Sequence, residues 1–212
     1  MQRGKFITIE GIEGVGKSTN IDLLASLIEQ HGHRVLKTRE PGGTPIAENI
    51  RRILKEHGDE PLPDVAEMLL LFAARSINVN NAIRPALESG TWVIADRFTD
   101  STRAYQGGGR GFPRESIEWL AEFVHGDLQP DLTILLDAPV DTAMQRAGRR
   151  GDLDRFEVEQ GISSIACAKL TCNSPRASPG ASPSWTVPRT SLPCRRSSAK
   201  SRPRCWIIND IN

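Results

Sequence analysis

Cysteine is absent from the first 160 residues of this 212-residue chain, and all 4 cysteines lie in the last quarter. No run of 18 consecutive apolar residues occurs, so the sequence predicts no membrane-spanning helix. The N-terminal MQRGKFITIEG has no apolar signal core. The net charge is only +1, which gives no reason to expect a nucleic-acid or membrane partner. These absences favour a soluble protein of the cytoplasm.

Acidic residues almost disappear after Gln160. Residues 161–212 hold 8 of the 27 basic residues but, in Asp210, only 1 of the 26 acidic ones. They are rich in Ser, Pro, Arg and Cys and show no sustained helical or strand period. We therefore expect a folded domain over 1–160 and an aberrant tail over 161–212, mostly disordered over 171–205. Translation in another reading frame produces this kind of change, and a genuine variant tail is the alternative.

Within 1–160, apolar β-branched runs alternate with helical stripes. Because this alternation is typical of α/β proteins, it predicts a parallel sheet between two layers of helices, with ligands at the carboxyl ends of the strands. Pro85 should kink or shorten the end of one long helix, and 107–111 should form a flexible loop. The strands are expected at 5–10, 34–38, 92–95 and 132–136, and the helices at 19–30, 46–55, 64–88, 113–125 and 140–149.

A glycine-rich segment follows the first predicted strand. Residues 11–18 read GIEGVGKS and fit G-x-x-x-x-G-K-[ST] between a strand and a helix, so the fold is expected to be of the P-loop NTPase type. Its N–H groups can face phosphate oxygens, Lys17 can reach the β- and γ-phosphates, and Ser18 can ligate Mg²⁺. A chance match is the alternative, which the strand–loop–helix context disfavours. The expected ATP-phosphate contacts are Gly11, Ile12, Glu13, Gly14, Val15, Gly16, Lys17, Ser18 and Thr19.

Charged and aromatic residues follow the other strands. Asp96 can hold Mg²⁺, and Arg97 can neutralise charge on transferred phosphate, although a surface ion pair is the alternative. Arg39 and Arg51 offer guanidinium forks for an acceptor phosphate, with a solvated helix face as the alternative for Arg51.

An aromatic residue and an arginine lie three apart on the expected long helix. Phe72 and Arg75 therefore share a face, where the ring can stack on a base and the guanidinium can donate to a base carbonyl. Core packing is the alternative for Phe72, since three leucines precede it.

Six segments in one order resemble bacterial thymidylate kinases, over about residues 4–160. They are EGIEGVGKST (10–19), TREPGGTPIAE (38–48), LLLFAAR (69–75), DRFTDSTRAYQGGGRG (96–111), GDLQPDLTILLD (126–137) and RRGDLDRFE (149–157). The resemblance implies a homodimeric nucleoside-monophosphate kinase that transfers the ATP γ-phosphoryl group to dTMP, with Mg²⁺, giving dTDP for dTTP synthesis. The alternatives are another monophosphate kinase, or a catalytically impaired nucleotide-binding product of a frameshifted gene.

The same resemblance assigns roles to individual residues. It implies that Glu13 faces the acceptor sugar and its 3′-hydroxyl, and that Tyr105 crowds the sugar 2′ position and so favours deoxyribose. Thr102 and Gln106 resemble base-edge contacts. The aromatic residue lies four positions before the arginine in many relatives, where this chain has Leu71. The implied dTMP contacts are Glu13, Arg39, Arg51, Phe72, Arg75, Arg97, Thr102, Tyr105 and Gln106.

Three arginines precede the sequence GDLDR at 151–155. Arg146, Arg149 and Arg150 resemble the base of a mobile lid that closes over ATP. Relatives whose P-loop has no extra basic residue supply a lid arginine to the transferred phosphoryl group, and Lys17 is the one basic residue of this P-loop. Gly148 stands where some relatives carry another arginine, and a solvated basic helix end is the alternative.

Relatives continue past this point with a helix, a short final strand and a closing helix. Since 161–212 departs from that pattern, we expect the final strand to be missing or replaced. We also expect weak binding of ATP, because these last elements belong to the donor site.

Overall fold

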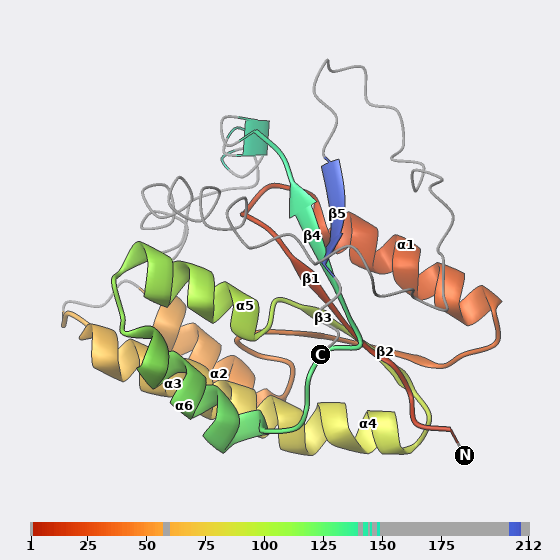
Figure 1. Cartoon of the computed structure of the whole chain (residues 1–212), viewed down its shortest axis with the longest axis horizontal. Helices are drawn as coiled ribbons and strands as arrows, with labels where there is room; N and C mark the ends of the chain where they lie inside the picture. The colour runs from red at the N-terminus through yellow and green to blue at the C-terminus, as the bar shows by residue number, and fades with distance from the viewer. Residues whose placement is uncertain are drawn as a thin grey trace, which may run out of the picture.

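A five-stranded sheet forms the centre of the molecule (Figure 1). The computed structural model describes residues 2–56, 60–139, 142, 143, 145, 148 and 204–208. The strands stand in the order β2-β3-β1-β4-β5. They are β1 (Phe6–Glu10), β2 (Val35–Arg39), β3 (Trp92–Asp96), β4 (Leu132–Asp137) and β5 (Arg204–Ile208).

The first four strands are parallel, which confirms the predicted α/β class. In the register, Ile7 of β1 lies opposite Ile94 of β3 on one side and Leu132 of β4 on the other. All five residues of β1 are buried, as expected for a central strand covered on both faces.

Helices cover both faces of this sheet. They are α1 (Lys17–Gln30), α2 (Pro45–Lys55), α3 (Asp64–Asn78), α4 (Arg84–Glu88), α5 (Thr99–Thr102) and α6 (Arg114–His125), with the π-helical segments η1 (Val79–Ile83) and η2 (Arg103–Gly109). Because side chains alternate along a strand, Ile7 and Ile94 pack with α1, whereas Phe6 and Val93 pack with η1 and α4. The three layers of the expected architecture are thus present.

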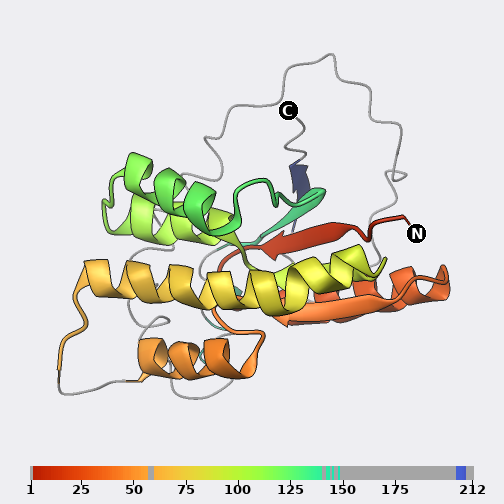
Figure 2. The same ribbon diagram turned by 90° about the horizontal axis from the view of Figure 1, so that it is seen from below.

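The long helix predicted over 64–88 is present but changes its winding near Pro85. The segments α3, η1 and α4 follow one another without a break and form the rod along one side of the sheet in Figure 2. In the wider π turn, the Arg84 N–H donates to the Val79 carbonyl five residues earlier. Since Pro85 has no N–H, a local change of winding lets the helix continue past it.

The prediction of a loop over 107–111 is wrong for most of its length, because α5 and η2 carry the chain helically to Gly109. Contacts with α6 explain the difference. Arg103 forms a bidentate pair with Glu118 at 2.9 and 2.8 Å. A Cβ on Gly107 would come within 3.2 Å of Ile117, so glycine permits this close approach. These tertiary contacts outweigh the weak helix propensity of glycine.

The edge beside β4 carries β5, from the region expected to lack its final strand. β5 runs antiparallel to β4, with Thr133 opposite Ile208 and Asp137 opposite Arg204. The sequence CWII is a short apolar, β-branched run that suits a strand, and the edge of β4 offers unpaired backbone groups. Of the segment 171–205, predicted to be mostly disordered, Arg204 and Cys205 belong to β5, and 171–203 lie outside the described residues.

Of the helix predicted over 140–149, the described residues Thr142, Ala143, Gln145 and Gly148 are helical. Among all described helices, none combines the length and the apolar character that crossing a membrane requires.

Candidate functional site

The glycine-rich turn leaves the end of β1 and enters α1. Gly11, Gly14 and Gly16 have φ angles of 143°, 75° and 100°, which side-chain-bearing residues rarely adopt. Gly16 precedes the first residue of α1, and its carbonyl accepts hydrogen bonds from the backbone and side chain of Asn20. The turn thus directs the amino terminus of α1 and its partial positive charge toward the sheet edge.

Lys17 folds back under this turn. Its Nζ donates to the carbonyls of Gly11 and Ile12, both at 3.2 Å, and lies 3.7 Å from Glu13 Oε2. Only 6% of the side chain is exposed, and this burial lowers the pKa of Lys17 to about 8. The ammonium group is therefore held within the glycine-rich turn at the amino terminus of α1, an arrangement that suits a polyphosphate.

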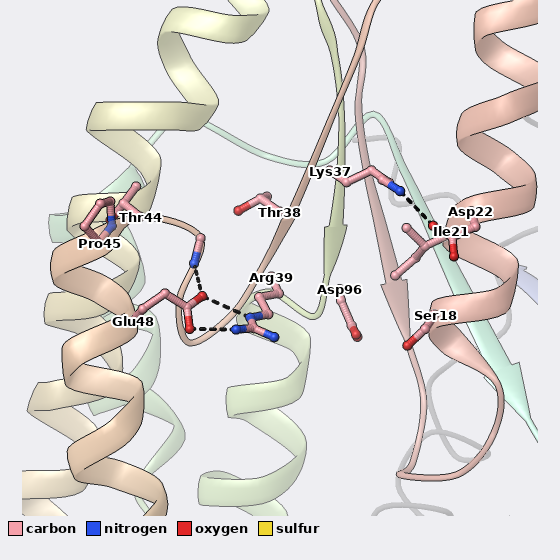
Figure 3. A pocket seen from close by; sticks show the side chains of 11 residues that line it. Ser18, Ile21, Asp22, Lys37, Thr38, Arg39, Thr44, Pro45, Glu48 and Asp96 are labelled. Atoms are coloured by element: carbon pink, nitrogen blue, oxygen red, sulfur yellow. Dashed lines mark hydrogen bonds and ion pairs between the residues drawn. The ribbon is translucent and has the colours of Figure 1, made fainter.

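Two cavities meet at Ser18 and Asp96. One, of about 400 Å³, is bounded by the glycine-rich turn, and the other, of about 650 Å³, lies between α1 and the β2–α2 connection. Figure 3 shows Asp96 and Ser18 pointing toward the larger cavity, with Arg39 and Glu48 on its opposite side. These two residues thus connect the regions expected to hold donor and acceptor.

Asp96 carries an unsatisfied acceptor at this junction. Its Oδ1 atom is buried and has no hydrogen-bond partner among the described residues. Ser18 adds a hydroxyl beside it, and oxygen ligands of this kind fit Mg²⁺, which binds few protein groups and keeps several waters. Within the described part of the chain, no group of three or more His, Cys, Asp or Glu side chains is placed to hold a metal.

Arg97 joins three sequence motifs in one place. Its Nη2 lies 3.5 Å from Glu13 Oε2, and its guanidinium carbon stands 5.0 Å from the centre of the Tyr105 ring. Its Nη1 donates to Ser101 Oγ at 3.1 Å. The φ angle of Arg97 is +74°, a strained conformation for a residue with a side chain. The strain is held at the point where β3 turns into α5.

Glu10 was not among the predicted site residues, yet it organises this turn. The carboxylate accepts from the Phe98 N–H at 2.8 Å and from the Ser101 hydroxyl at 2.6 Å. Burial raises the pKa of Glu10 to about 7. An acid at the end of a buried strand, one residue before the glycine-rich turn, is the signal in the sequence that could have identified it.

The predicted base-binding residues gather between α3 and α5. Arg75 is 3% exposed; its Nε donates to Glu40 Oε2 at 2.6 Å and its Nη2 to Thr102 Oγ1 at 3.0 Å. Its guanidinium carbon lies 4.7 Å from the centre of the Phe72 ring. Phe72 is 2% exposed and packs with Met68 and α6, so it also has the core role that the sequence left open.

Two further arginines are engaged within the β2–α2 connection. Arg39 forms a bidentate pair with Glu48 at 3.0 and 2.7 Å, and Arg51 Nη1 donates to the Pro41 carbonyl at 2.8 Å. Arg39 lines the larger cavity, whereas Arg51 does not. Arg146, Arg149 and Arg150 lie outside the described residues.

Known proteins match this chain over the same region. The family model for thymidylate kinase matches residues 9–169. The chain belongs to the thymidylate kinase family. A thymidylate kinase of Pseudomonas syringae pv. tomato is 52% identical over 176 residues, 83% of this chain and 84% of that protein. One of Ectopseudomonas mendocina is 54% identical over 156 residues, 74% of each chain.

A solved structure agrees with this assignment. Thymidylate kinase from Ehrlichia chaffeensis superposes with a TM-score of 0.60 at 35% identity, covering 77% of this chain and 83% of that one. The thymidylate kinase match includes the glycine-rich turn, the Arg97 cluster and the three arginines at 146, 149 and 150. It runs past Gln160 as far as residue 169 and leaves β5 outside.

Proposed function

We propose that this chain transfers the γ-phosphoryl group of ATP to dTMP, giving dTDP for dTTP synthesis. One observation supports this proposal above all: three groups of residues lie at the carboxyl edge of one parallel sheet. They are the turn with Lys17, the cluster of Arg97, Tyr105 and Glu13, and the cluster around Arg75. Membership of the thymidylate kinase family supports the choice of substrate. We also propose that the reaction takes place in the cytoplasm, which fractionation of cells expressing the chain tests.

The donor side would use the turn from Gly11 to Thr19. Backbone N–H groups and Lys17 bind the phosphates, and burial of Lys17 excludes water from its ammonium group. Ser18 and Asp96 would hold Mg²⁺, whose charge neutralises phosphate oxygens when it is bound. Thr19, an exposed residue in the first turn of α1, lines the smaller cavity and would also contact the phosphates.

The acceptor side would use side chains of α3, α5 and η2. Arg75 Nη1 is buried without a partner in the described structure and could donate to a base carbonyl. Thr102 and Gln106 complete the base edge, while Glu13 would accept from the sugar 3′-hydroxyl and Tyr105 would exclude a 2′-hydroxyl. Phe72 would supply the aromatic contact to the base.

The acceptor phosphate would be bound by Arg39 and Arg51, each of which then exchanges its present contact for the phosphate. Arg97 lies between the two sides and would neutralise charge as the phosphoryl group moves. We propose the same role for one of Arg146, Arg149 and Arg150. Catalysis therefore rests on alignment and charge neutralisation, with no covalent enzyme intermediate.

A substrate panel tests the proposal. The full chain is assayed with ATP, Mg²⁺ and dTMP, dUMP, dCMP, dGMP or dAMP, by coupling ADP release to NADH oxidation. The highest kcat/KM is expected for dTMP. A higher value for dCMP or dGMP would make it another monophosphate kinase, and no turnover with any acceptor would favour the impaired product of a frameshifted gene.

The division of the chain at residue 160 is also a proposal. It rests on the loss of acidic residues beyond Gln160. Limited trypsin digestion followed by mass spectrometry should cut after Lys169, Arg176 and Arg189 before any site within 1–160. Equal resistance of both parts would contradict the division, and the DNA sequence around codon 160, read in three frames, would decide the frameshift.

We further propose that the chain forms a homodimer through α3 and α6. Four large apolar side chains are exposed there: Val65 at 61% and Leu69 at 53% on α3, Trp119 at 64% and Phe123 at 75% on α6. Each pair is four residues apart, and the two rings stack with centres 5.4 Å apart. An apolar face of this kind is typical of a buried interface.

Sedimentation velocity tests the dimer. Wild-type protein is expected to sediment at twice the chain mass, and Phe123→Glu is expected to shift it toward the monomer, because a charge would be buried in the interface. Glu115→Gln, on the same helix, is the control. A monomeric wild type would refute the proposal.

A further inference from the structure

A second buried carboxylate, Glu67 on α3, contacts a predicted base-edge residue. Gln106 on η2 is 4% exposed, and its Nε2 donates to Glu67 Oε1 at 3.0 Å. Glu67 is 1% exposed. An ionised carboxylate has no hydrogen to donate, so it can bond only to the nitrogen of the amide. The contact therefore fixes which end of the Gln106 amide faces Glu67.

Glu67 is itself held from the other side. Arg110 Nη2 lies 3.0 Å from Glu67 Oε2, and Arg110 Nη1 donates to Asp64 Oδ1 at 2.8 Å. The Arg110 guanidinium has donors only, so Glu67 is an acceptor toward Arg110 as it is toward Gln106. With its nitrogen committed to Glu67, Gln106 has its carbonyl oxygen, Oε1, to offer a ligand.

Two cross-links connect the same pair of helical segments. Glu67 and Arg75 are eight residues apart on α3, and Thr102 and Gln106 are four apart on α5 and η2, so each pair shares a face. The bonds Arg75–Thr102 and Gln106–Glu67 are both 3.0 Å long. In the first cross-link, Arg75 Nη1 is a buried donor without a partner among the described residues. In the second, the nitrogen of the Gln106 amide faces Glu67, so its acceptor Oε1 faces away from that carboxylate.

We propose that Glu67 is a positioning residue for base selection: it orients Gln106 so that Oε1 accepts from the ring N–H of thymine. This inference rests on the proposed function. Thymine and uracil carry a ring N–H between two carbonyls, whereas cytosine has an unprotonated nitrogen there and an amino group beside it. A fixed donor at Arg75 and a fixed acceptor at Gln106 therefore match a carbonyl and the ring N–H of thymine. With cytosine, the Arg75 donor would face the amino group, and the Gln106 oxygen would face the unprotonated ring nitrogen, so neither hydrogen bond could form.

The decisive variant is Glu67→Gln in the full chain. The new amide has the shape of the carboxylate but can also donate, so Gln106 can turn its nitrogen toward the base. Equilibrium binding of dTMP, dUMP and dCMP is measured by calorimetry, and kcat/KM by the coupled assay. The dTMP/dCMP ratio is expected to fall by about tenfold, mainly through KM. The dTMP/dUMP ratio should not change, since both bases carry the ring N–H.

Three further variants separate orientation from packing. Asp64→Asn removes the charge of the Arg110–Asp64 pair without changing Glu67, and should leave the dTMP/dCMP ratio unchanged. In a Gln106→Leu background, Glu67→Gln should have no further effect on that ratio. Glu67→Asp keeps the charge beside Arg110 but shortens the reach to Gln106, so it should also lower the dTMP/dCMP ratio. This variant provides the test if Glu67→Gln does not fold.

Each result supports or overturns the inference. An unchanged dTMP/dCMP ratio in both Glu67 variants, or the same change with and without Gln106, would mean that Glu67 is only a packing residue. A wild type that binds dCMP as well as dTMP would instead overturn the proposed function itself. Calorimetry keeps the test independent of turnover.

Discussion

Replacing Glu40 with glutamine should destabilise the fold more than any exposed charge substitution. Glu40 and Arg75 are each only 3% exposed, and Arg75 Nε lies 2.6 Å from Glu40 Oε2. The glutamine amide oxygen can still accept a hydrogen bond from Arg75. The buried guanidinium then loses the negative charge of its ion pair and is left with neutral partners such as that amide, the Thr102 hydroxyl and two aromatic rings. Breaking a buried pair in this way costs about 3–5 kcal/mol, a large share of the roughly 5–15 kcal/mol that stabilises a domain.

The free energy of unfolding can be measured by urea titration with tryptophan fluorescence. The matched control is Asp22→Asn, which breaks the Lys37–Asp22 pair of similar length, 2.8 Å, in which both side chains are mostly exposed. The control should unfold almost as the wild type does. A double variant, Glu40→Leu with Arg75→Met, should recover much of the loss, since it leaves no buried charge unpaired.

A loss below about 1 kcal/mol in Glu40→Gln would refute this reasoning. Burial raises the pKa of Glu40 against the opposing effect of Arg75. If burial prevails, the carboxyl group is already neutral in the fold, and replacing it with a neutral amide changes little. The measurement therefore also decides whether the base-binding region contains an ion pair.

Three other expectations concern single residues. Lys17→Ala should lower kcat/KM for dTMP by about two to three orders of magnitude with an unchanged circular dichroism spectrum; wild-type turnover would disprove the role of the glycine-rich turn. Tyr105→Ala should narrow the preference for dTMP over its ribose analogue, and an unchanged ratio of kcat/KM values would make Tyr105 a packing residue. Burial raises the pKa of Glu10 from 4.5 to about 7, so the folded state favours the protonated carboxyl group. The resulting contribution to the free energy of unfolding is fully present below pH 4.5 and is lost as the pH rises through 7. Glu10→Gln should therefore gain stability relative to wild type between pH 5 and 8 in urea titrations, whereas parallel pH profiles would argue against a raised pKa.

The parallel strands could be predicted because their signal is local. A buried strand such as β1, FITIE, is a short, mostly apolar and β-branched run, and its character does not depend on distant residues. The glycine-rich turn could be predicted for the same reason, since its spacing is contained within eight residues. Lys17 and Ser18 can therefore be placed at the start of a helix without knowledge of the fold.

The helical segment over 99–109 could not be predicted from local sequence. Its stability comes from contacts with distant parts of the chain, such as Arg103 with Glu118 and Gln106 with Glu67. The roles of Glu10, Glu40 and Glu67 depend on the same kind of contact, because each carboxylate binds a side chain or N–H at least 35 positions away. Their sequence neighbours say nothing of these partners.

The left-handed backbone at Arg97 has a consequence for protein engineering. Glycine, and to a lesser degree asparagine, adopts a φ of +74° with little strain, whereas for arginine this conformation costs about 1 kcal/mol or more. Directed evolution for heat resistance alone should therefore enrich Arg97→Gly or Arg97→Asn variants that fold better and no longer transfer phosphate. A thermostabilised form of this enzyme should be selected with turnover as a second criterion, because at this position the two properties select for different amino acids.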